Sequence, residues 1–294
     1  MAVLALGFFD GVHVGHAALL RAARALADRL GCDAEAITFD THPSALLSSS
    51  PQPLLGSVDD RRILMTRFVD RVRVLPFNRE TLHTPWQTFA AQVLADADGL
   101  VCGYDYRFGE NGAGTADSLR QFAAARNIPC EVIPPVQLDG GAVSSTRIRK
   151  LLQDGETAQA VQLLGHPHLI SGTVSHGQQL GHTLGFPTAN LPFASGILVP
   201  AYGVYAAKAE TAEGTFDAVC NVGTHPTVGA LDAAQAEAWL LDFDGDLYGQ
   251  PIRLWIYDRL REERAFPDLA SLKAEILRNA EQVRQLAKNG QMNF

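Results

Sequence analysis

Two histidines near the start of the chain have a spacing suited to phosphate chemistry. His13 and His16 frame the sequence His-Val-Gly-His, which follows an apolar run and precedes a segment rich in alanine and leucine. This order predicts a strand, a glycine-bearing loop and a helix. The imidazoles would then lie at a helix N-terminus, where unpaired N–H groups and the helix dipole favour a phosphate. Histidines three apart also occur in structural roles, but in this context they favour a nucleotide-handling enzyme.

Three further segments of the first half carry polar groups beside predicted strands or helices. Residues 38–43 (TFDTHP) and 103–109 (GYDYRFG) each follow an apolar run, and each is also compatible with a simple turn. Residues 144–149 (SSTRIR) open a helical segment. Hydroxyls there commonly cap the helix, whereas guanidinium groups bind phosphate in a bidentate way. Arg147 and Arg149 would suit a triphosphate, and residues 38–43 could contact the substrate directly.

A sheet must position these groups. Up to about residue 150, short apolar runs alternate with helical patterns, which predicts a parallel sheet covered by helices on both faces. Ligands of such sheets bind beyond the carboxyl ends of the strands, where His13 and His16 would lie. The predicted strands are 3–9, 34–39, 73–75, 99–102 and 130–134, and the first helix is 17–30.

The second half has a different pattern. After about residue 168, β-like runs follow one another until a helical pattern returns at 269–286. Short strands followed by one terminal helix predict an antiparallel barrel or sandwich. Asp244-Gly245 lies between two runs and predicts a hairpin. The predicted strands are 170–175, 203–210, 215–222, 237–243 and 252–257, and one helix, 151–164, is expected to join the halves and end near Gly165.

Closely spaced glycines mark the start of this second half. Glycines in residues 172–185 could wrap the backbone around a phosphate, although Gly-Phe-Pro-Thr at 185–188 is also an ordinary turn. The acidic run 242–246 does not fit a calcium loop, because Leu247 and Arg253 stand where glycine and glutamate are required. It predicts a turn with solvated carboxylates.

Length and composition limit the classes of function. The 294 residues suggest two domains, and a net charge of −8 argues against binding nucleic acid by charge alone. Four scattered cysteines indicate neither a zinc site nor a disulfide framework, which favours a reducing compartment. No charged leader precedes the first apolar run, and no run reaches the roughly 18 apolar residues of a membrane span. We therefore expect a cytoplasmic protein with neither a membrane nor a nucleic-acid partner.

The first half resembles the adenylyltransferase module of bacterial bifunctional riboflavin kinase/FAD synthetases. The resemblance rests on residues 7–16 (GFFDGVHVGH), 103–109 and 144–149. It implies an α/β Rossmann-like (HUP-type) nucleotidyltransferase domain that transfers AMP from ATP to FMN and releases pyrophosphate. It also implies that His13 and His16 are catalytic and stabilise the phosphates. The expected nucleotide- or flavin-binding residues are Gly7, Phe9, Asp10, Gly11, Asp105, Ser145, Thr146 and Arg149.

The second half resembles the riboflavin kinase module of the same family, through residues 184–190, 221–227 and 237–249. This implies a mainly antiparallel β-barrel kinase domain with a C-terminal helix. Thr188 would ligate Mg²⁺ with the ATP phosphates, Asn190 would support that site, and Glu237 would be the catalytic base for the ribityl 5′-hydroxyl. Only the resemblance singles out Glu237. The other expected nucleotide- or flavin-binding residues are His176, Gly177, Gly181, Gly185, Pro187 and Arg261.

The resemblance implies conversion of riboflavin to FMN and of FMN to FAD, with ATP as co-substrate and ADP and pyrophosphate as products. The expected domains are 1–152 and 169–294, with a linker region at 153–168. The sequence departs from the family pattern at two places. Thr41 stands where relatives often carry proline, and Thr224-His225 precedes Pro226 where arginine is common. The second departure weakens the expected substrate affinity of the kinase, because histidine is not a permanent bidentate cation.

Three alternatives stay open beside this interpretation. One module could have lost its activity, or the first half could adenylylate another phosphate ester, such as phosphopantetheine or a nicotinamide nucleotide. The chain could also be a flavin-binding carrier without turnover. Nothing in the sequence decides between a monomer and a weak oligomer.

Overall fold

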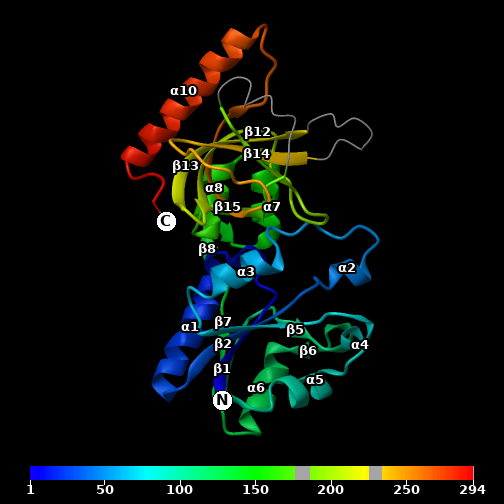
Figure 1. The fold of residues 1–294 in the computed structure, drawn as a ribbon. Coiled ribbons are helices and arrows are strands. Elements are labelled where there is room, and N and C mark those ends of the chain that lie inside the picture. The colour runs from blue at the N-terminus through cyan, green and yellow to red at the C-terminus, as the bar shows by residue number, and fades with distance from the viewer. Residues whose placement is uncertain (176–185, 225–233, 294) are drawn as a thin grey trace. The chain divides into compact units, whose positions relative to one another are not determined.

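The chain divides into two compact units in a computed structural model that describes residues 1–175, 186–224 and 234–293 (Figure 1). The first unit comprises Met1–Leu54 and Val58–Ser145, and the second comprises Leu55–Ser57 and Thr146–Phe294. Each unit has its own main sheet and its own hydrophobic core.

The first unit contains the predicted parallel sheet. Its five strands lie in the order β3-β2-β1-β4-β7, and every pairing is parallel. The strand order reverses at β1 and β4, so a crevice for ligands is expected beyond the carboxyl ends of these two strands. The strands are β1 (Ala2–Leu6), β2 (Asp33–Phe39), β3 (Arg71–Leu75), β4 (Ala97–Gly103) and β7 (Cys130–Ile133).

Helices cover both faces of this sheet. All five residues of β1 are buried, as is usual for a central parallel strand. Leu4 and Leu6 pack with apolar residues of α5 (Trp86–Val93) and α6 (Ala116–Ala124). On the opposite face, α1 (Val14–Leu30) contacts β1, β2 and β4. The smaller elements are η1 (Asp10–Val12), α2 (Ser44–Leu47), α3 (Val58–Met65), α4 (Arg79–Leu82), β5 (Arg107–Phe108), η2 (Glu110–Gly112), β6 (Gly114–Thr115), β8 (Gln137–Leu138) and β9 (Gly141–Ala142).

The second unit contains a nearly closed antiparallel barrel, as the sequence predicts. Its six strands lie in the order β10-β15-β12-β13-β14-β11. The two outer strands meet through a bridge between Ser175 and Asn190, in which the N–H of Ser175 donates to the Asn190 carbonyl at 2.8 Å. The strands are β10 (His168–Thr173), β11 (Ala189–Pro192), β12 (Gly203–Thr211), β13 (Gly214–Thr224), β14 (Ala234–Leu240) and β15 (Pro251–Glu262).

The C-terminal helix α10 (Leu269–Lys288) packs on the outer face of β12 and β13. Ala280 and Val283 of this helix share an apolar cluster with Val204 and Val219. Asp268 caps the helix by accepting a hydrogen bond from the N–H of Ser271 at 2.7 Å. The predicted terminal helix is therefore confirmed.

Two predictions about the connections are wrong. The single helix expected at 151–164 is two helices, α7 (Ser145–Asp154) and α8 (Thr157–Leu164), because Gly155 has a φ of 82° and a Cβ there would collide with Arg259. Gly165 does end the second helix, with a φ of 76°. The Asp244-Gly245 hairpin is absent, because β12 and β13 separate β14 from β15 in the sheet. A local turn signal does not determine which strands pair.

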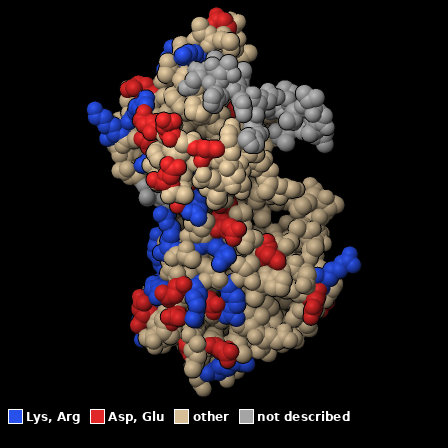
Figure 2. All heavy atoms as spheres, viewed as in Figure 1, with Lys and Arg blue, Asp and Glu red and all other residues tan. Residues whose placement is uncertain are grey.

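On the face shown in Figure 2, acidic and basic side chains are interspersed over the described residues. In the first unit, ion pairs join neighbouring strands, such as Arg73 with Glu35 at 2.7 Å and Arg71 with Asp33 at 3.2 Å. Within the described ranges, no helix combines the length and apolar character that a membrane span requires.

We expect the second unit to lose stability in mild acid through His168. This side chain is 2% exposed, and burial, followed by the charge of His166, lowers its pKa to about 3. The unfolded chain binds a proton near pH 6.5, so the stabilising effect of the neutral ring is complete above that pH. It is lost as the pH falls towards 3, by about 1.4 kcal/mol per pH unit.

Urea unfolding of the chain at several pH values, followed by tryptophan fluorescence, tests this expectation. His168→Leu should flatten the acid dependence of the free energy of unfolding. His83→Leu is the control, because the His83 side chain is 69% exposed. An unchanged slope in His168→Leu would contradict the assignment.

Candidate active sites

A strained loop follows β1 in the first unit. Phe9, Gly11 and Val12 all have positive φ values, of 59°, 73° and 41°. This conformation is costly for a β-branched residue such as Val12, and such strain is concentrated at functional sites. Left-handed residues in a turn are typical of loops that bind anions through backbone N–H groups.

The two predicted catalytic histidines lie together at the end of this loop. His13 is the N-cap of α1, and its Nδ1 accepts a hydrogen bond from the N–H of His16 at 3.3 Å. The two rings stack with centroids 3.6 Å apart. Because Nδ1 of His13 is an acceptor, the neutral ring carries its proton on Nε2 and can donate it to a phosphate oxygen. A Cβ on Gly15 would lie 3.2 Å from the His13 ring, so a side chain there would crowd it.

His16 lies in an environment that keeps its ring neutral. Its Nδ1 is buried and has no hydrogen-bond partner among the described residues. Burial, and then the charges of His13 and Arg61, hold the pKa of His16 well below 6.5. A neutral imidazole with an unpaired buried nitrogen can exchange a hydrogen bond with a ligand.

Other predicted residues of the first half gather around this loop. The hydroxyl of Ser145 donates to the carbonyl of Asp10 at 3.0 Å, although the two are 135 positions apart. Asp105 is exposed just beyond β4, at the same edge of the sheet. Thr146 and Arg149 belong to the second unit, where Arg149 Nη1 donates to Thr146 Oγ1 at 3.3 Å. Their participation in the nucleotide site stays a prediction.

Three polar residues of the second unit form a row across neighbouring strands. Glu237 on β14 pairs in register with Asn190 on β11 and with Asn221 on β13. Cross-strand partners hold their Cβ atoms about 4.5–5.5 Å apart. The residues on either side of Glu237, Ala236 and Ala238, belong to the core inside the barrel. Since side chains alternate along a strand, the row faces outward.

Asn190 carries a polar atom that fits an absent ligand. Its side chain is 3% exposed, and its Oδ1 is buried without a hydrogen-bond partner among the described residues. Thr188, two positions earlier, lines a cavity of about 220 Å³. Oxygen atoms of this kind are ligands that Mg²⁺ accepts. The cavity is also lined by Val174, Pro187, Ala189, Leu240, Phe243, Gly245, Asp246, Leu247 and Tyr248.

Comparisons with known proteins identify the family of both halves of the chain. The family profile of FAD synthetase matches residues 1–147, and that of riboflavin kinase matches residues 164–287. A protein of Listeria monocytogenes named bifunctional riboflavin kinase/FMN adenylyltransferase is 33% identical over 96% of this chain and 91% of its own length. The chain belongs to this bifunctional family. It therefore carries an FAD synthetase domain followed by a riboflavin kinase domain and is a bifunctional enzyme.

Further relatives support the assignment to the riboflavin kinase/FMN adenylyltransferase family. Proteins of that name from Pseudomonas fluorescens and Escherichia coli K12 are both 35% identical, over 97% and 94% of this chain and 93% and 90% of their own lengths. A crystal structure from Streptococcus pneumoniae, described as a macrolide-efflux protein, has a TM-score of 0.82 and 30% identity. It covers 96% of this chain and 93% of its own. The fold is thus shared over nearly the whole chain.

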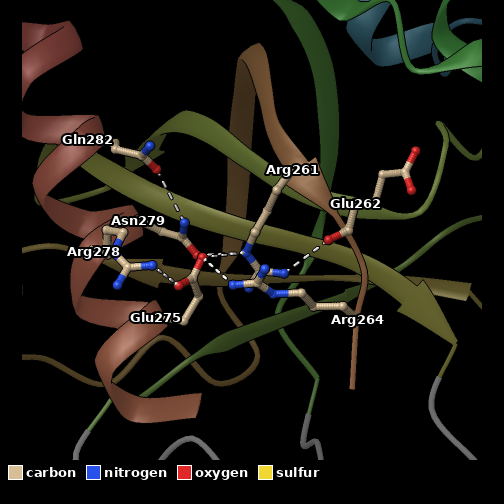
Figure 3. A network of polar contacts seen from close by, with 7 residues as sticks. All are labelled: Arg261, Glu262, Arg264, Glu275, Arg278, Asn279 and Gln282. Atoms are coloured by element: carbon tan, nitrogen blue, oxygen red, sulfur yellow. Dashed lines mark hydrogen bonds and ion pairs between the residues drawn. The ribbon is translucent and has the colours of Figure 1, made fainter. Parts of the chain in front are cut away.

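Arg261 of the riboflavin kinase domain lies in a polar network between β15 and α10 (Figure 3). Its Nε is 3.5 Å from a Glu275 carboxylate oxygen and donates to Asn279 Oδ1 at 3.2 Å. Arg264 and Arg278 pair with the same carboxylate, which is largely buried. The network ties the end of β15 to the helix. The predicted contact of Arg261 with nucleotide or flavin stays a prediction.

Several predicted residues of the riboflavin kinase domain lie outside the described residues, namely His176, Gly177, Gly181, Gly185 and His225. Sequence reasoning also missed two residues that the structure places beside predicted site residues. Gln235 Nε2 donates to Glu237 Oε1 at 3.0 Å, and the two-residue spacing on a strand could have revealed it. Arg61 lies under residues 7–13, the loop between β1 and α1, which we call the histidine loop. The signal that could have revealed its burial is its spacing from Leu64 and Met65 on one helix face.

Proposed function

We propose that the two activities occur at separate sites: FMN is adenylylated to FAD in domain 1–152, and riboflavin is phosphorylated to FMN in domain 169–294. The observation that carries this proposal is the presence of two polar constellations in two different units. One is the stacked histidine pair at the end of β1, and the other is the row of Asn190, Glu237 and Asn221.

In the kinase reaction, the Glu237 carboxylate accepts the proton of the ribityl 5′-hydroxyl. The alcohol becomes acidic only as its oxygen bonds to the γ-phosphorus of ATP, so a carboxylate can serve as its base. Gln235 orients one carboxylate oxygen through the 3.0 Å hydrogen bond. Asn190, the cross-strand neighbour of Glu237, offers its Oδ1, which has no partner among the described residues, to the substrate hydroxyl or to the metal.

Thr188 and Asn190 are the residues that would hold Mg²⁺ together with the phosphates of ATP. When bound, the ion supplies positive charge that offsets charge building up on the transferred phosphoryl group. The cavity beside Thr188 has apolar and aromatic walls, including Phe243 and Tyr248, which suit the flat base of the nucleotide.

In the adenylyl transfer, an FMN phosphate oxygen attacks the α-phosphorus of ATP, and the bond to the pyrophosphate oxygen breaks. The attacking group is already a strong anion, so the protein needs no covalent intermediate. His13 donates from Nε2 and His16 from its neutral ring to oxygens of the polyphosphate, while the backbone of the loop and the N-terminus of α1 add further positive potential. Positioning and charge stabilisation account for the catalysis.

A time course with flavin-free protein, riboflavin, ATP and Mg²⁺, resolved by chromatography, tests the proposal. FMN should appear first and FAD should follow. FMN that accumulates without FAD would refute the assignment of the first domain. Unchanged riboflavin, together with unchanged FMN when FMN is supplied, would favour a flavin carrier.

Replacing Gln235 by leucine is expected to lower kcat of riboflavin phosphorylation by about tenfold, the equivalent of one hydrogen bond to a carboxylate. FAD formation from supplied FMN should be unchanged. The matched control is Gln285→Leu, which removes an exposed glutamine whose amide donates to Glu281 at 3.2 Å. Equal kinase rates in the two variants would show that Gln235 does not orient Glu237.

A further inference from the structure

A fully buried arginine lies beneath the histidine loop of the FAD synthetase domain. Arg61, on α3, is 0% exposed, and Leu64 and Met65 on the same helix face are also buried. Arginine is almost never fully buried unless it is paired. A position with this spacing would ordinarily hold an apolar residue.

The guanidinium of Arg61 joins the carboxyl ends of two neighbouring strands. Nη1 donates to the carbonyl of Phe8 at 2.8 Å and to Oγ1 of Thr38 at 2.7 Å, and Nη2 donates to the carbonyl of Phe39 at 2.9 Å. The group also lies over the Phe8 ring, 4.1 Å from its centroid. Phe8 follows β1 and Phe39 ends β2. The Arg61 side chain therefore holds the starts of the two loops that follow these strands.

The buried charge is costly and persists at neutral pH. Burial lowers the pKa of Arg61 to about 10, while the charges of Asp10, Asp40 and Asp60 act in the opposite direction. The Nε atom is buried with no partner in the described part of the chain. Apolar residues of similar volume often stabilise a protein more than buried ions do. Stability alone therefore does not explain an arginine at this position.

We propose that Arg61 is a positioning residue for adenylyl transfer. It fixes the loop that carries His13 and His16 relative to the loop after β2. It also places a permanent positive charge beneath the bound phosphates. This inference rests on the proposed role of the two histidines.

The test compares Arg61→Met, Arg61→Lys and Arg62→Met in the full-length chain. Arg62 is the matched control, because it is adjacent on α3, its side chain is 56% exposed, and it lies 3.7 Å from Asp59. We expect Arg61→Met to lower kcat for FAD formation by about 10²-fold, with the riboflavin kinase rate of the same preparation unchanged. Arg61→Lys should recover part of the loss, since lysine keeps the charge but lacks the planar fork.

Titration of the His16 ring by NMR gives a readout that does not depend on turnover. The charges of His13 and Arg61 both lower the pKa of this ring. Removing the Arg61 charge should raise the pKa of His16, and Arg62→Met should leave it unchanged. An arginine that only supported folding would not raise the pKa of His16 on removal and also allow Arg61→Lys to recover part of the FAD formation rate.

Three results would overturn the proposal. The first is an unchanged kcat for FAD formation in Arg61→Met, and the second is an unchanged pKa of His16 in that variant. The third is an equal loss of FAD formation in Arg61→Met and Arg61→Lys, accompanied by loss of kinase activity. The last would show that Arg61 only supports folding. If His16→Ala keeps full FAD formation while Arg61→Met still shifts the His16 titration, the proposed histidine chemistry fails instead.

Discussion

Replacing Glu237 by glutamine is expected to lower kcat of riboflavin phosphorylation by about 10²–10⁴-fold, the usual contribution of a general base. Glutamine has nearly the same shape but cannot take the proton of the 5′-hydroxyl. The substitution should change KM for riboflavin far less than kcat, because the lost interaction belongs to the transition state. Initial rates of FMN formation, measured by chromatography, provide the test.

Two controls make this result specific. FAD formation from supplied FMN should be unchanged in Glu237→Gln, because the FAD synthetase domain is separate. Glu213→Gln replaces an exposed glutamate in the turn between β12 and β13 and should leave both rates unchanged. A Glu237→Gln enzyme with the wild-type kinase rate would refute the assignment of the base.

Replacing His16 by alanine is expected to lower kcat of FAD formation by about 10²–10³-fold, the effect of removing one preorganised donor to a developing charge. His13 would also lose its stacking contact with the His16 ring, whose centroid lies 3.6 Å from its own. Phosphorylation of riboflavin should continue, so FMN should accumulate. The time course of FMN and FAD in one reaction shows both effects.

His83→Ala is the control for this substitution, because His83 is exposed and pairs with Glu110 at 3.3 Å. It should leave FAD formation unchanged. Loss of both activities in His16→Ala, or in Glu237→Gln, would contradict the separation into two sites.

Much of the fold follows from local patterns. The apolar run of β1 is buried on both faces, so its continuous hydrophobicity identifies a central parallel strand. The alternation around Glu237, with alanines on both sides in the core, identifies a strand with one outward face. The prediction of a hairpin at Asp244-Gly245 was wrong, because β15 pairs with β10 and β12, and such pairing depends on long-range contacts.

The sites were less accessible to sequence reasoning. Resemblance alone selected Glu237, since nothing local distinguishes it from other glutamates. Arg61 was missed because its hydrogen bonds reach Phe8 and Phe39, which are far away in sequence. Asp10 and Ser145 are likewise distant in sequence and meet only in the folded unit. Contacts of this kind depend on tertiary structure, which a linear pattern does not encode.

The seam between β10 and β11 determines which activity is lost first in denaturant. Among the residues that the structure describes, Ser175 and Asn190 join the two outer strands through one isolated bridge, whereas β12 and β15 are paired along most of their length. Regions with few hydrogen bonds open at lower free energy than the rest of a domain. Because Asn190 also belongs to the proposed phosphorylation site, opening of this seam would inactivate the kinase before the barrel unfolds. Mild denaturant should therefore abolish FMN production at concentrations where tryptophan fluorescence is still native.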